Sequence, residues 1–288
     1  LMILQGTLLD ARDQRRSAIG PEEDPTVRYD RGLARIRLAL QAVADALGDV
    51  DAFIDSQDDR DLTNPVLASE IAIRLVAAGR AAEALAILNR APPGDGRFGV
   101  FECRWTDARI AALDALERSD EAQALRLAFF EKALSRDHLR AYLERLPDFE
   151  DTEAEQQALD RVADDPRFHE ALWFLIHWPA LPRAARLVEE RPNLLDGDLY
   201  EMLNPAAEAL EARHPLAAAL LRRALVTFTL EHARSTRYGH AARHIRELES
   251  LDTLIADYGT HETHEMFVDR LKREHARKHG FWSRLEKT

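Results

Sequence analysis

The chain has 288 residues, of which 46% are hydrophobic and 31% are charged, and its formal net charge at pH 7 is −12. This composition is typical of an ordered globular protein and excludes a collagen-like or disulfide-rich chain. An acidic chain repels phosphate backbones and anionic lipids, so we expect neither a nucleic acid nor a membrane as its partner.

The single cysteine, Cys103, excludes an intramolecular disulfide and a cysteine-rich zinc module. We therefore predict a reducing, cytoplasmic location. The apolar opening of residues 1–4 is too short for the core of a signal peptide. Because the chain begins with Leu rather than Met, we expect residues 1–26 to be an irregular segment or the remnant of a missing N-terminal half.

Helix formers dominate the chain, with only 12 Gly and 12 Pro, and no segment alternates as a half-buried strand does. The first expected helix spans residues 27–47, where Leu33, Ile36, Leu40 and Val43 recur at helical spacing before Gly48. An Asn-Pro or His-Pro pair, which suits the start of a helix, begins the helices expected after residues 64, 204 and 214.

The clearest unit is residues 68–91, in which two apolar helical runs flank Gly79 and end at a Pro-Pro-Gly sequence. This pattern predicts a helical hairpin of the tetratricopeptide kind. The following loop, residues 92–104, is either a surface excursion, which we favour, or a sub-boundary between two halves. Further helices are expected at residues 105–117, 120–134, 137–146, 153–163, 167–178, 181–190, 198–203, 205–213, 216–234, 238–258 and 261–279.

The fold class predicted from these elements is all-α, with residues 27–288 forming an α-solenoid of stacked antiparallel helical hairpins, tetratricopeptide-like in kind. The most apolar stretch, residues 216–230, is interrupted by Arg222 and Arg223. It therefore predicts a buried helix rather than a membrane span. We expect the closing Gly-Phe-Trp, residues 280–282, to cap a helix and cover the last hairpin, in preference to a role on nucleic acid or membrane.

Six segments of the chain resemble an uncharacterised family of bacterial helical-repeat proteins: residues 48–52, 78–85, 146–151, 178–181, 237–244 and 275–282. The closing Lys-x-x-Phe-Trp is also similar to the helical tails of some SWIM zinc-finger proteins, although the Cys-x-Cys module is absent. The resemblance implies a helical-repeat fold and, in front of this chain, a further helical half. It implies no catalytic residue.

Seven of the eleven histidines follow residue 231. His240 and His244, like His275 and His279, are four residues apart and share a helix face, which is geometry that zinc accepts. The chain lacks a His-Glu-x-x-His motif, and His244 lies in line with apolar Leu248. We therefore favour half-buried histidines and expect no metal, cofactor or catalytic residue.

The C-terminal region is also the most cationic: residues 222–288 hold 13 Lys/Arg against 10 Asp/Glu, whereas the preceding residues hold 26 against 41. Within it, Arg234, Arg237 and Arg243 lie within ten residues of one another together with Tyr238 and His240. This cluster either binds a carboxylate or phosphate or forms surface salt bridges to the acidic body. We expect binding to strengthen below about pH 6.5, as the histidines protonate. The candidate binding residues are Arg234, Arg237, Tyr238, His240, His244, His261 and His264.

Two functions remain open from the sequence. The first is a non-enzymatic scaffold that binds a protein or peptide, with an acidic partner favoured by the cationic cluster. The alternative is a metal-dependent enzyme or sensor that uses the C-terminal His/Arg cluster.

Overall fold

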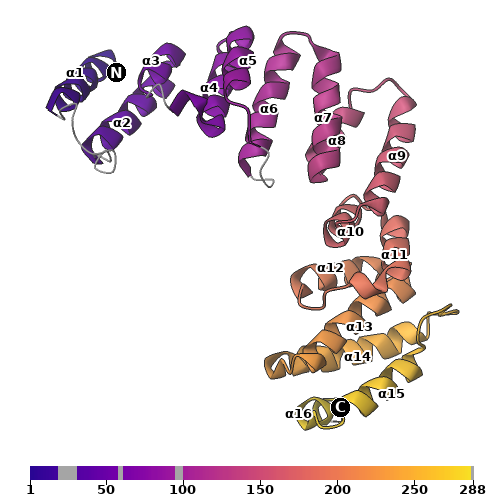
Figure 1. The fold of residues 1–288 in the computed structure, drawn as a ribbon. Helices are drawn as coiled ribbons and strands as arrows, with labels where there is room; N and C mark the ends of the chain where they lie inside the picture. Colours follow the sequence, from indigo (N-terminus) through magenta and orange to yellow (C-terminus); the bar gives the residue numbers. More distant parts are fainter. Residues whose placement is uncertain (19–30, 58–60, 95–99, 287–288) are drawn as a thin grey trace. The chain divides into compact units, whose positions relative to one another are not determined.

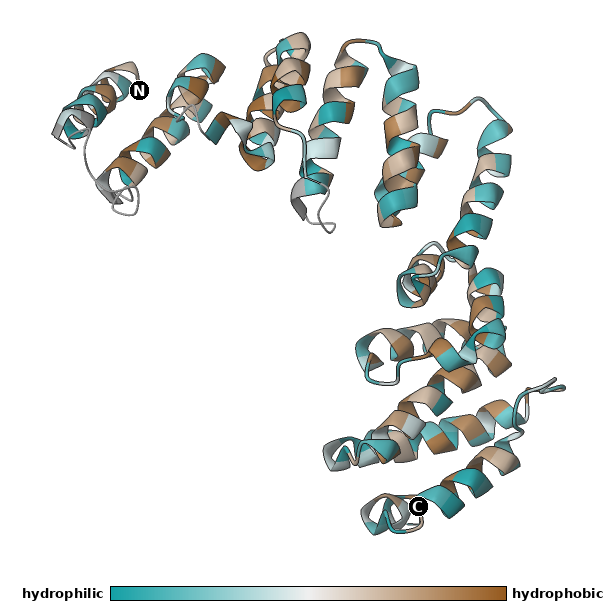
Figure 2. Cartoon of the chain, in the orientation of Figure 1, coloured by the Kyte–Doolittle hydropathy of each residue, from teal (hydrophilic) through white to brown (hydrophobic). Residues whose placement is uncertain are grey.

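The computed structural model describes residues 1–18, 31–57, 61–94 and 100–286 of the chain. These residues form sixteen α-helices and three short 3₁₀ helices, and no strand is found among them (Figure 1). The all-α prediction is therefore confirmed for the described part of the chain. Hydrophobic and hydrophilic residues alternate along the helices, as expected for helices that each bury one face (Figure 2). The chain divides into two compact units, Leu1–Ala133 and Leu134–Thr288.

Unit 1 is a series of helices in which each packs on its neighbours in the chain, and α4 also packs on α6. Its buried core includes Ile71, Leu75, Leu88 and Leu113, contributed by three different helices. The helices are α1 (Met2–Ala18), α2 (Arg31–Leu47), α3 (Val50–Asp55), α4 (Pro65–Ala77), α5 (Ala81–Arg90), α6 (Val100–Ala115) and α7 (Ser119–Ala133), with the 3₁₀ turn η1 (Asp61–Thr63).

The hairpin predicted over residues 68–91 is confirmed as α4 and α5. The Asn64 side chain accepts a hydrogen bond from the Val66 amide at 2.9 Å, and Pro65 occupies the first helical position. Gly79 has a φ of +76°, a left-handed conformation in which a side chain is strained. The following amide, that of Arg80, donates to the Leu75 carbonyl at 2.8 Å and closes the turn.

Two alternatives kept open for unit 1 do not agree with the structure. Residues 2–18 form α1, which packs on α2, so an irregular segment is wrong for them, whereas the remnant of a missing N-terminal half stays a prediction; residues 19–26 lie outside the described part. The sub-boundary at 92–104, the alternative to the favoured surface excursion, falls inside unit 1, since α6 packs on both α4 and α5. The core thus includes residues on both sides of that loop, and the division between the two units falls after Ala133.

Unit 2 is built around α13, which packs on α11, α12 and α14. Eleven of its 17 residues are buried, among them Arg222 and Arg223, so the predicted buried helix over 216–230 is confirmed. The helices are α8 (Arg136–Leu143), α9 (Glu150–Asp164), α10 (Phe168–His177), α11 (Leu181–Glu190), α12 (Tyr200–Glu211), α13 (Pro215–Glu231), α14 (Tyr238–Asp252), α15 (His264–Glu274) and α16 (His279–Leu285), with the 3₁₀ turns η2 (Pro192–Leu194) and η3 (Ser235–Arg237).

The helix break expected at Asn204-Pro205 is wrong, because α12 continues through Pro205. Leu203 and Leu210, on either side of the proline, are both fully buried. Their packing holds the helix together although proline supplies no amide hydrogen for it. The start predicted at His214-Pro215, by contrast, is observed.

The end of the chain also differs from the prediction. The helix expected over 261–279 is shorter in the structure: α15 starts where the Thr263 hydroxyl accepts from the Met266 amide at 3.2 Å and ends at Glu274, and a separate helix, α16, begins at His279. Gly280 lies inside α16 and caps no helix. Phe281 is fully buried and its ring lies 6.0 Å from that of Tyr238, so this part of the predicted apolar plug is confirmed.

Candidate functional site

A pocket of about 340 Å³ lies between α12, α13 and α14 in unit 2, and we call it the α12–α14 pocket. Two arginines and two histidines line it, and none of its lining residues is acidic. On a chain of net charge −12 this is a local concentration of cationic and titratable groups. The lining residues are Gly197, Tyr200, Asn204, Leu225, Thr229, Thr236, Arg237, His240, Ala241, Arg243 and His244.

Helix α14 supplies three of the four arginine and histidine side chains of the wall. Residues 240 and 244 are one turn apart on this helix, and 241 and 243 lie between them, so all four border the pocket from the same side of the helix. The adjoining face of α14 holds Ile245, Leu248 and Leu251, all buried, which fixes the rotation of the helix about its axis. The apolar period of α14 thereby directs its cationic residues to the pocket.

Arg237 links the loop before α12 to the start of α14 through its side chain. Its guanidinium donates to Asp198 Oδ1 at 2.9 Å, and its Cζ lies 4.5 Å from the centre of the Tyr200 ring. These two contacts hold Arg237 in place, so much of its charge is already compensated by Asp198. Arg237 therefore shapes the pocket more than it offers a free cation.

Arg243 is the freer of the two arginines. Its side chain is 57% exposed, and Nη2 lies 3.2 Å from His240 Nδ1, with Arg243 as the donor. In this arrangement the neutral His240 ring carries its proton on Nε2. Arg243 Nε is 3.7 Å from Glu247, an exposed and therefore weak pairing. Both side chains thus keep donors for a ligand.

His244 is buried beside a charged network. Its Nδ1 lies 2.8 Å from Glu247 Oε2, and the same carboxylate is 3.4 Å from Nε of the buried Arg222, which also pairs with Glu211. Burial lowers the pKa of His244, because desolvation of the imidazolium outweighs its attraction to Glu247. At neutral pH His244 is therefore a neutral donor to Glu247.

The lowered pKa of His244 predicts in which direction the stability of the protein changes with pH. The unfolded chain binds the proton first, at about pH 6.5, so the stability due to neutral His244 is complete above that pH and is lost as the pH falls towards the folded pKa. We expect the melting temperature to fall between about pH 7.5 and 5.5. The variant His244→Gln, which keeps a neutral donor, should fall less steeply.

Burial also lowers the pKa of His169 and of His264, and these histidines add to the same fall. Glu189 acts in the opposite direction, since burial raises its pKa. Comparison of the parent with His244→Gln isolates one group, and the exposed His232→Gln is the matched control. Identical pH profiles for the parent and His244→Gln would contradict the assignment.

The structure brings Arg237, His240 and His244 together in the α12–α14 pocket, and places the other predicted residues elsewhere. Arg234 is exposed outside it, and Tyr238 is buried against Phe281. His261 lines a different pocket, and His264 starts α15. Among the described residues, no group of three or more His, Cys, Asp or Glu side chains is arranged to hold a metal ion.

Four polar residues of the pocket were not foreseen as ligand contacts: Tyr200, Asn204, Thr229 and Thr236. They lie on α12, α13 and η3, and only the packing of α12 and α14 onto α13 brings them near His240. Among these four residues, only Asn204 belonged to a recognisable sequence pattern, the Asn-Pro pair, and that pattern was interpreted as the start of a helix. The side-chain Oδ1 of Asn204 is buried and accepts no hydrogen bond in the structure.

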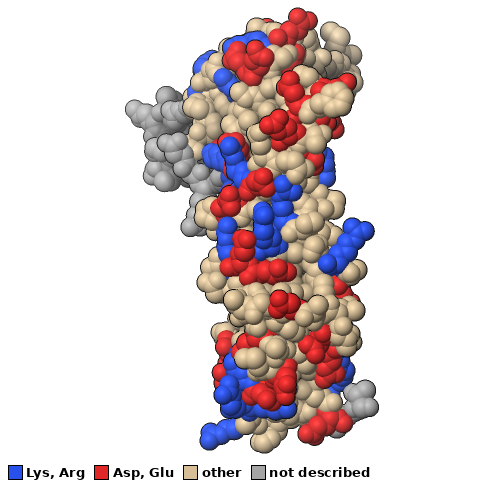
Figure 3. All heavy atoms as spheres, turned by 90° about the vertical axis from the view of Figure 1, so that its right-hand side faces the viewer, with Lys and Arg blue, Asp and Glu red and all other residues tan. Residues whose placement is uncertain are grey.

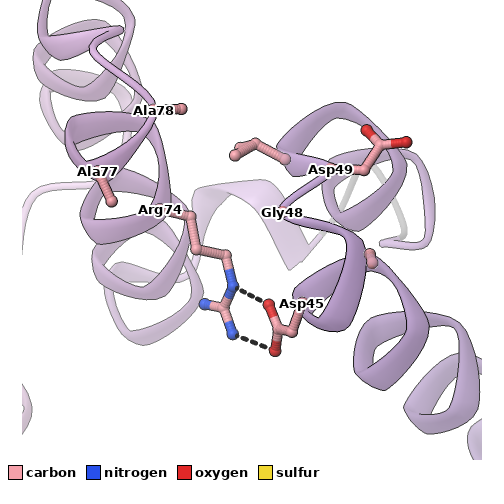
Figure 4. Close-up of a pocket in the computed structure, with 8 residues that line it drawn as sticks. Asp45, Gly48, Asp49, Arg74, Ala77 and Ala78 are labelled. Carbon is pink, nitrogen blue, oxygen red and sulfur yellow. Dashed lines mark hydrogen bonds and ion pairs between the residues drawn. The ribbon is translucent and has the colours of Figure 1, made fainter.

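Unit 1 has a smaller pocket of about 200 Å³ between α2 and α4 (Figure 4). Arg74 crosses it and donates to both carboxylate oxygens of Asp45, at 2.6 and 2.9 Å. This pairing holds the pKa of Asp45 below its usual value, and Arg74 Cζ also lies 3.8 Å from the centre of the Phe53 ring. Both charges are therefore satisfied within the protein, which indicates a structural role.

Elsewhere the charges are mixed. On the face drawn in Figure 3, Lys and Arg side chains lie beside Asp and Glu side chains. Among the ion pairs of the described residues, Arg183 donates to Asp160 at 2.8 Å and links α11 to α9. Exposed pairs of this kind contribute little stability each. No described helix is both long and apolar enough to cross a membrane.

These observations define an all-helical protein with a cationic pocket in its C-terminal unit. Over residues 7–284 the chain matches the model of DUF6880, described as a family of unknown function, and it belongs to that family. No curated protein and no solved structure matches the chain.

Proposed function

We propose that this chain is a non-enzymatic helical-repeat scaffold that binds an acidic segment of a partner protein in the α12–α14 pocket. The observation that carries the proposal is the lining of that pocket: two arginines, two histidines and no acidic side chain, on a protein of net charge −12. An anionic group near this pocket is attracted, whereas the rest of the acidic chain repels it.

The scaffold part of the proposal is supported by how the helices pack. Within each unit, the substantial contacts among described helices join neighbours or next neighbours in the chain, such as α4 with α5 and α6, or α11 with α13. Stacked helical hairpins of the tetratricopeptide kind pack in this way, since each hairpin covers the apolar face of the next. Such stacks commonly present extended surfaces to peptides, which is an argument from fold alone.

The choice of an acidic peptide follows from the donors of the pocket. Arg243 has unused N–H groups and His240 has its Nε2, both suited to a carboxylate. Tyr200, which lines the pocket, is 42% exposed. An exposed tyrosine offers rigid contact area to a peptide at low cost in side-chain entropy.

Arg243→Glu tests the proposal, with Arg234→Glu as the matched control. Both change an exposed arginine to glutamate in the same region, but only Arg243 lines the pocket. The probe is a deca-glutamate peptide carrying a neutral fluorophore, measured by fluorescence anisotropy. We expect Arg243→Glu to weaken binding at least about tenfold and Arg234→Glu to change it little. Reversal of a charge in contact with the bound peptide costs far more than reversal of a charge that solvent and salt screen from it.

Salt and a basic peptide complete the test. Binding of the parent should weaken when ionic strength rises from about 0.05 to 0.3 M, and a deca-lysine peptide should bind less well than deca-glutamate. Equal loss of affinity in the two variants would place the anionic ligand outside the pocket. A parent protein that prefers deca-lysine would contradict the proposed acidic partner.

A further inference from the structure

Arg223 on α13 is a buried arginine without an ionic partner. It is 6% exposed, and the one hydrogen bond of its side chain runs from Nη1 to the backbone carbonyl of Glu262 at 2.6 Å. Its Nε and Nη2 atoms are buried and have no acceptor, which leaves three of the five N–H groups of the guanidinium unsatisfied. Buried polar groups are nearly always paired, so this is an exception that needs an explanation.

The acidic residues nearest to Arg223 are engaged elsewhere. Both carboxylate oxygens of Glu262 accept from Arg270, at 2.9 and 3.1 Å. Asp252 Oδ1 accepts from the Tyr258 hydroxyl at 2.6 Å. Among the described residues no carboxylate lies within 4.0 Å of Arg223, and its Cζ instead lies 5.0 Å from the centre of the Phe267 ring and 5.2 Å from that of the Tyr258 ring.

The neighbouring arginine shows the contrast. Arg222 is equally buried, yet it pairs with Glu211 and lies 3.4 Å from Glu247. Removal of a charge from water is costly unless an opposite charge compensates it. In Arg222 that compensation comes from the protein, whereas in Arg223 two aromatic rings and one carbonyl supply only part of it.

Arg223 forms part of the wall of a second pocket, of about 520 Å³, which we call the Arg223 pocket. Its wall combines hydrophobic side chains, those of Leu195, Leu220 and Phe228, with the hydroxyl-bearing Thr227 and with charged side chains that include Asp196. The volume lies within the range of small-molecule sites. Arg243 and His240 do not line this pocket; Gly197 lines both.

We infer that the Arg223 pocket binds a small aliphatic monocarboxylate, whose carboxylate pairs with Arg223 and whose hydrocarbon part contacts Leu195, Leu220 and Phe228. A planar guanidinium with free N–H groups matches a carboxylate. A single negative charge balances the one unpaired cation. Asp196, Glu231 and Glu262 also line the pocket, and they disfavour a more highly charged ligand such as phosphate.

Hexanoate is the probe, with hexanamide as its neutral analogue and inorganic phosphate as the alternative anion, each followed by isothermal titration calorimetry and by thermal shift. We expect hexanoate to bind at least about tenfold more tightly than hexanamide, as for a hydrogen bond to a charged group, and to raise the melting temperature. Tighter binding of phosphate than of hexanoate, or equal binding of hexanoate and hexanamide, would overturn the inference.

Two variants locate the site. Arg223→Met removes the charge and keeps an apolar side chain, an exchange that is often tolerated at a buried ionic position. Thr227→Phe fills the pocket and leaves Arg223 in place, so it decides the question if Arg223→Met does not fold. Each variant should lose hexanoate binding. Undiminished binding in a folded variant of either kind would show that hexanoate binds elsewhere.

Arg243→Glu, the variant that tests the α12–α14 pocket, should keep full hexanoate binding. This separates the two proposals, because loss of deca-glutamate binding with retained hexanoate binding, or the reverse, identifies which pocket fails. Loss of hexanoate binding in Arg243→Glu would contradict an independent Arg223 pocket.

Discussion

Phe281→Ala is expected to lower the free energy of unfolding by about 3–5 kcal/mol, the usual cost of truncating a fully buried phenylalanine. The Phe281 side chain is fully buried in α16 and makes edge contacts with the rings of Tyr238 and Trp282, at 6.0 and 4.9 Å between ring centres. Since Tyr238 is the first residue of α14, the cavity left by alanine also loosens the helix that carries His240 and Arg243.

Urea denaturation followed by circular dichroism measures this change. The control is Met266→Ala, which truncates a hydrophobic side chain of the same C-terminal region that is 58% exposed. We expect the control to alter stability by less than about 0.5 kcal/mol. If Phe281→Ala were as mild as Met266→Ala, α16 would not be a packed part of unit 2.

Gly197→Ala is expected to destabilise the protein by about 1–3 kcal/mol through overpacking. A Cβ atom at this position would lie 2.2 Å from the Ala224 carbonyl oxygen and 2.5 Å from Phe228 Cβ. The first of these atoms belongs to the backbone of the central helix α13, which cannot move aside cheaply. Gly197 also lines both pockets of unit 2, so the strain reaches both proposed sites.

Gly239→Ala is the matched control. It is the same exchange in the same unit, but the expected change in stability has the opposite sign. No atom lies within 4 Å of a Cβ built at Gly239, and the residue is in the first turn of α14. Alanine there should stabilise the protein by about 0.5–1 kcal/mol. Thermal denaturation of both variants tests the pair. If the melting temperature shifted in the same direction in both, the close approach of α13 would not be the reason for a glycine at position 197.

Where the sequence predicted the fold correctly, the signal was local. The Asn64 cap and the Gly79 turn depend on hydrogen bonds within five residues of the chain, so the α4–α5 hairpin was predictable. The continuity of α12 through Pro205 was not predictable, because the buried Leu203 and Leu210 hold this helix together through contacts with other helices. The missed break after Glu274 follows the same logic, since burial of Phe281 depends on α14.

The candidate site was predictable to a similar extent. The spacing of His240 and His244 along one helix placed them on a common face, and the structure puts both in one pocket, together with Arg243. The partners of these residues, Tyr200 and Thr229, come from helices that lie side by side only after folding. The residues next to Tyr200 and Thr229 in the sequence form no motif that indicates ligand binding.

The sequence by itself determined the all-helical class, most of the helix starts and the cationic character of the C-terminal region, because caps, periodicity and charge act through nearby residues. Only the tertiary structure decided which of these charges are satisfied. Arg222 and Arg223 are identical neighbours on one helix, yet they point to different surroundings, and only Arg222 meets carboxylates. Burial and pairing depend on which other helices arrive beside a residue, and that information is spread over the whole fold.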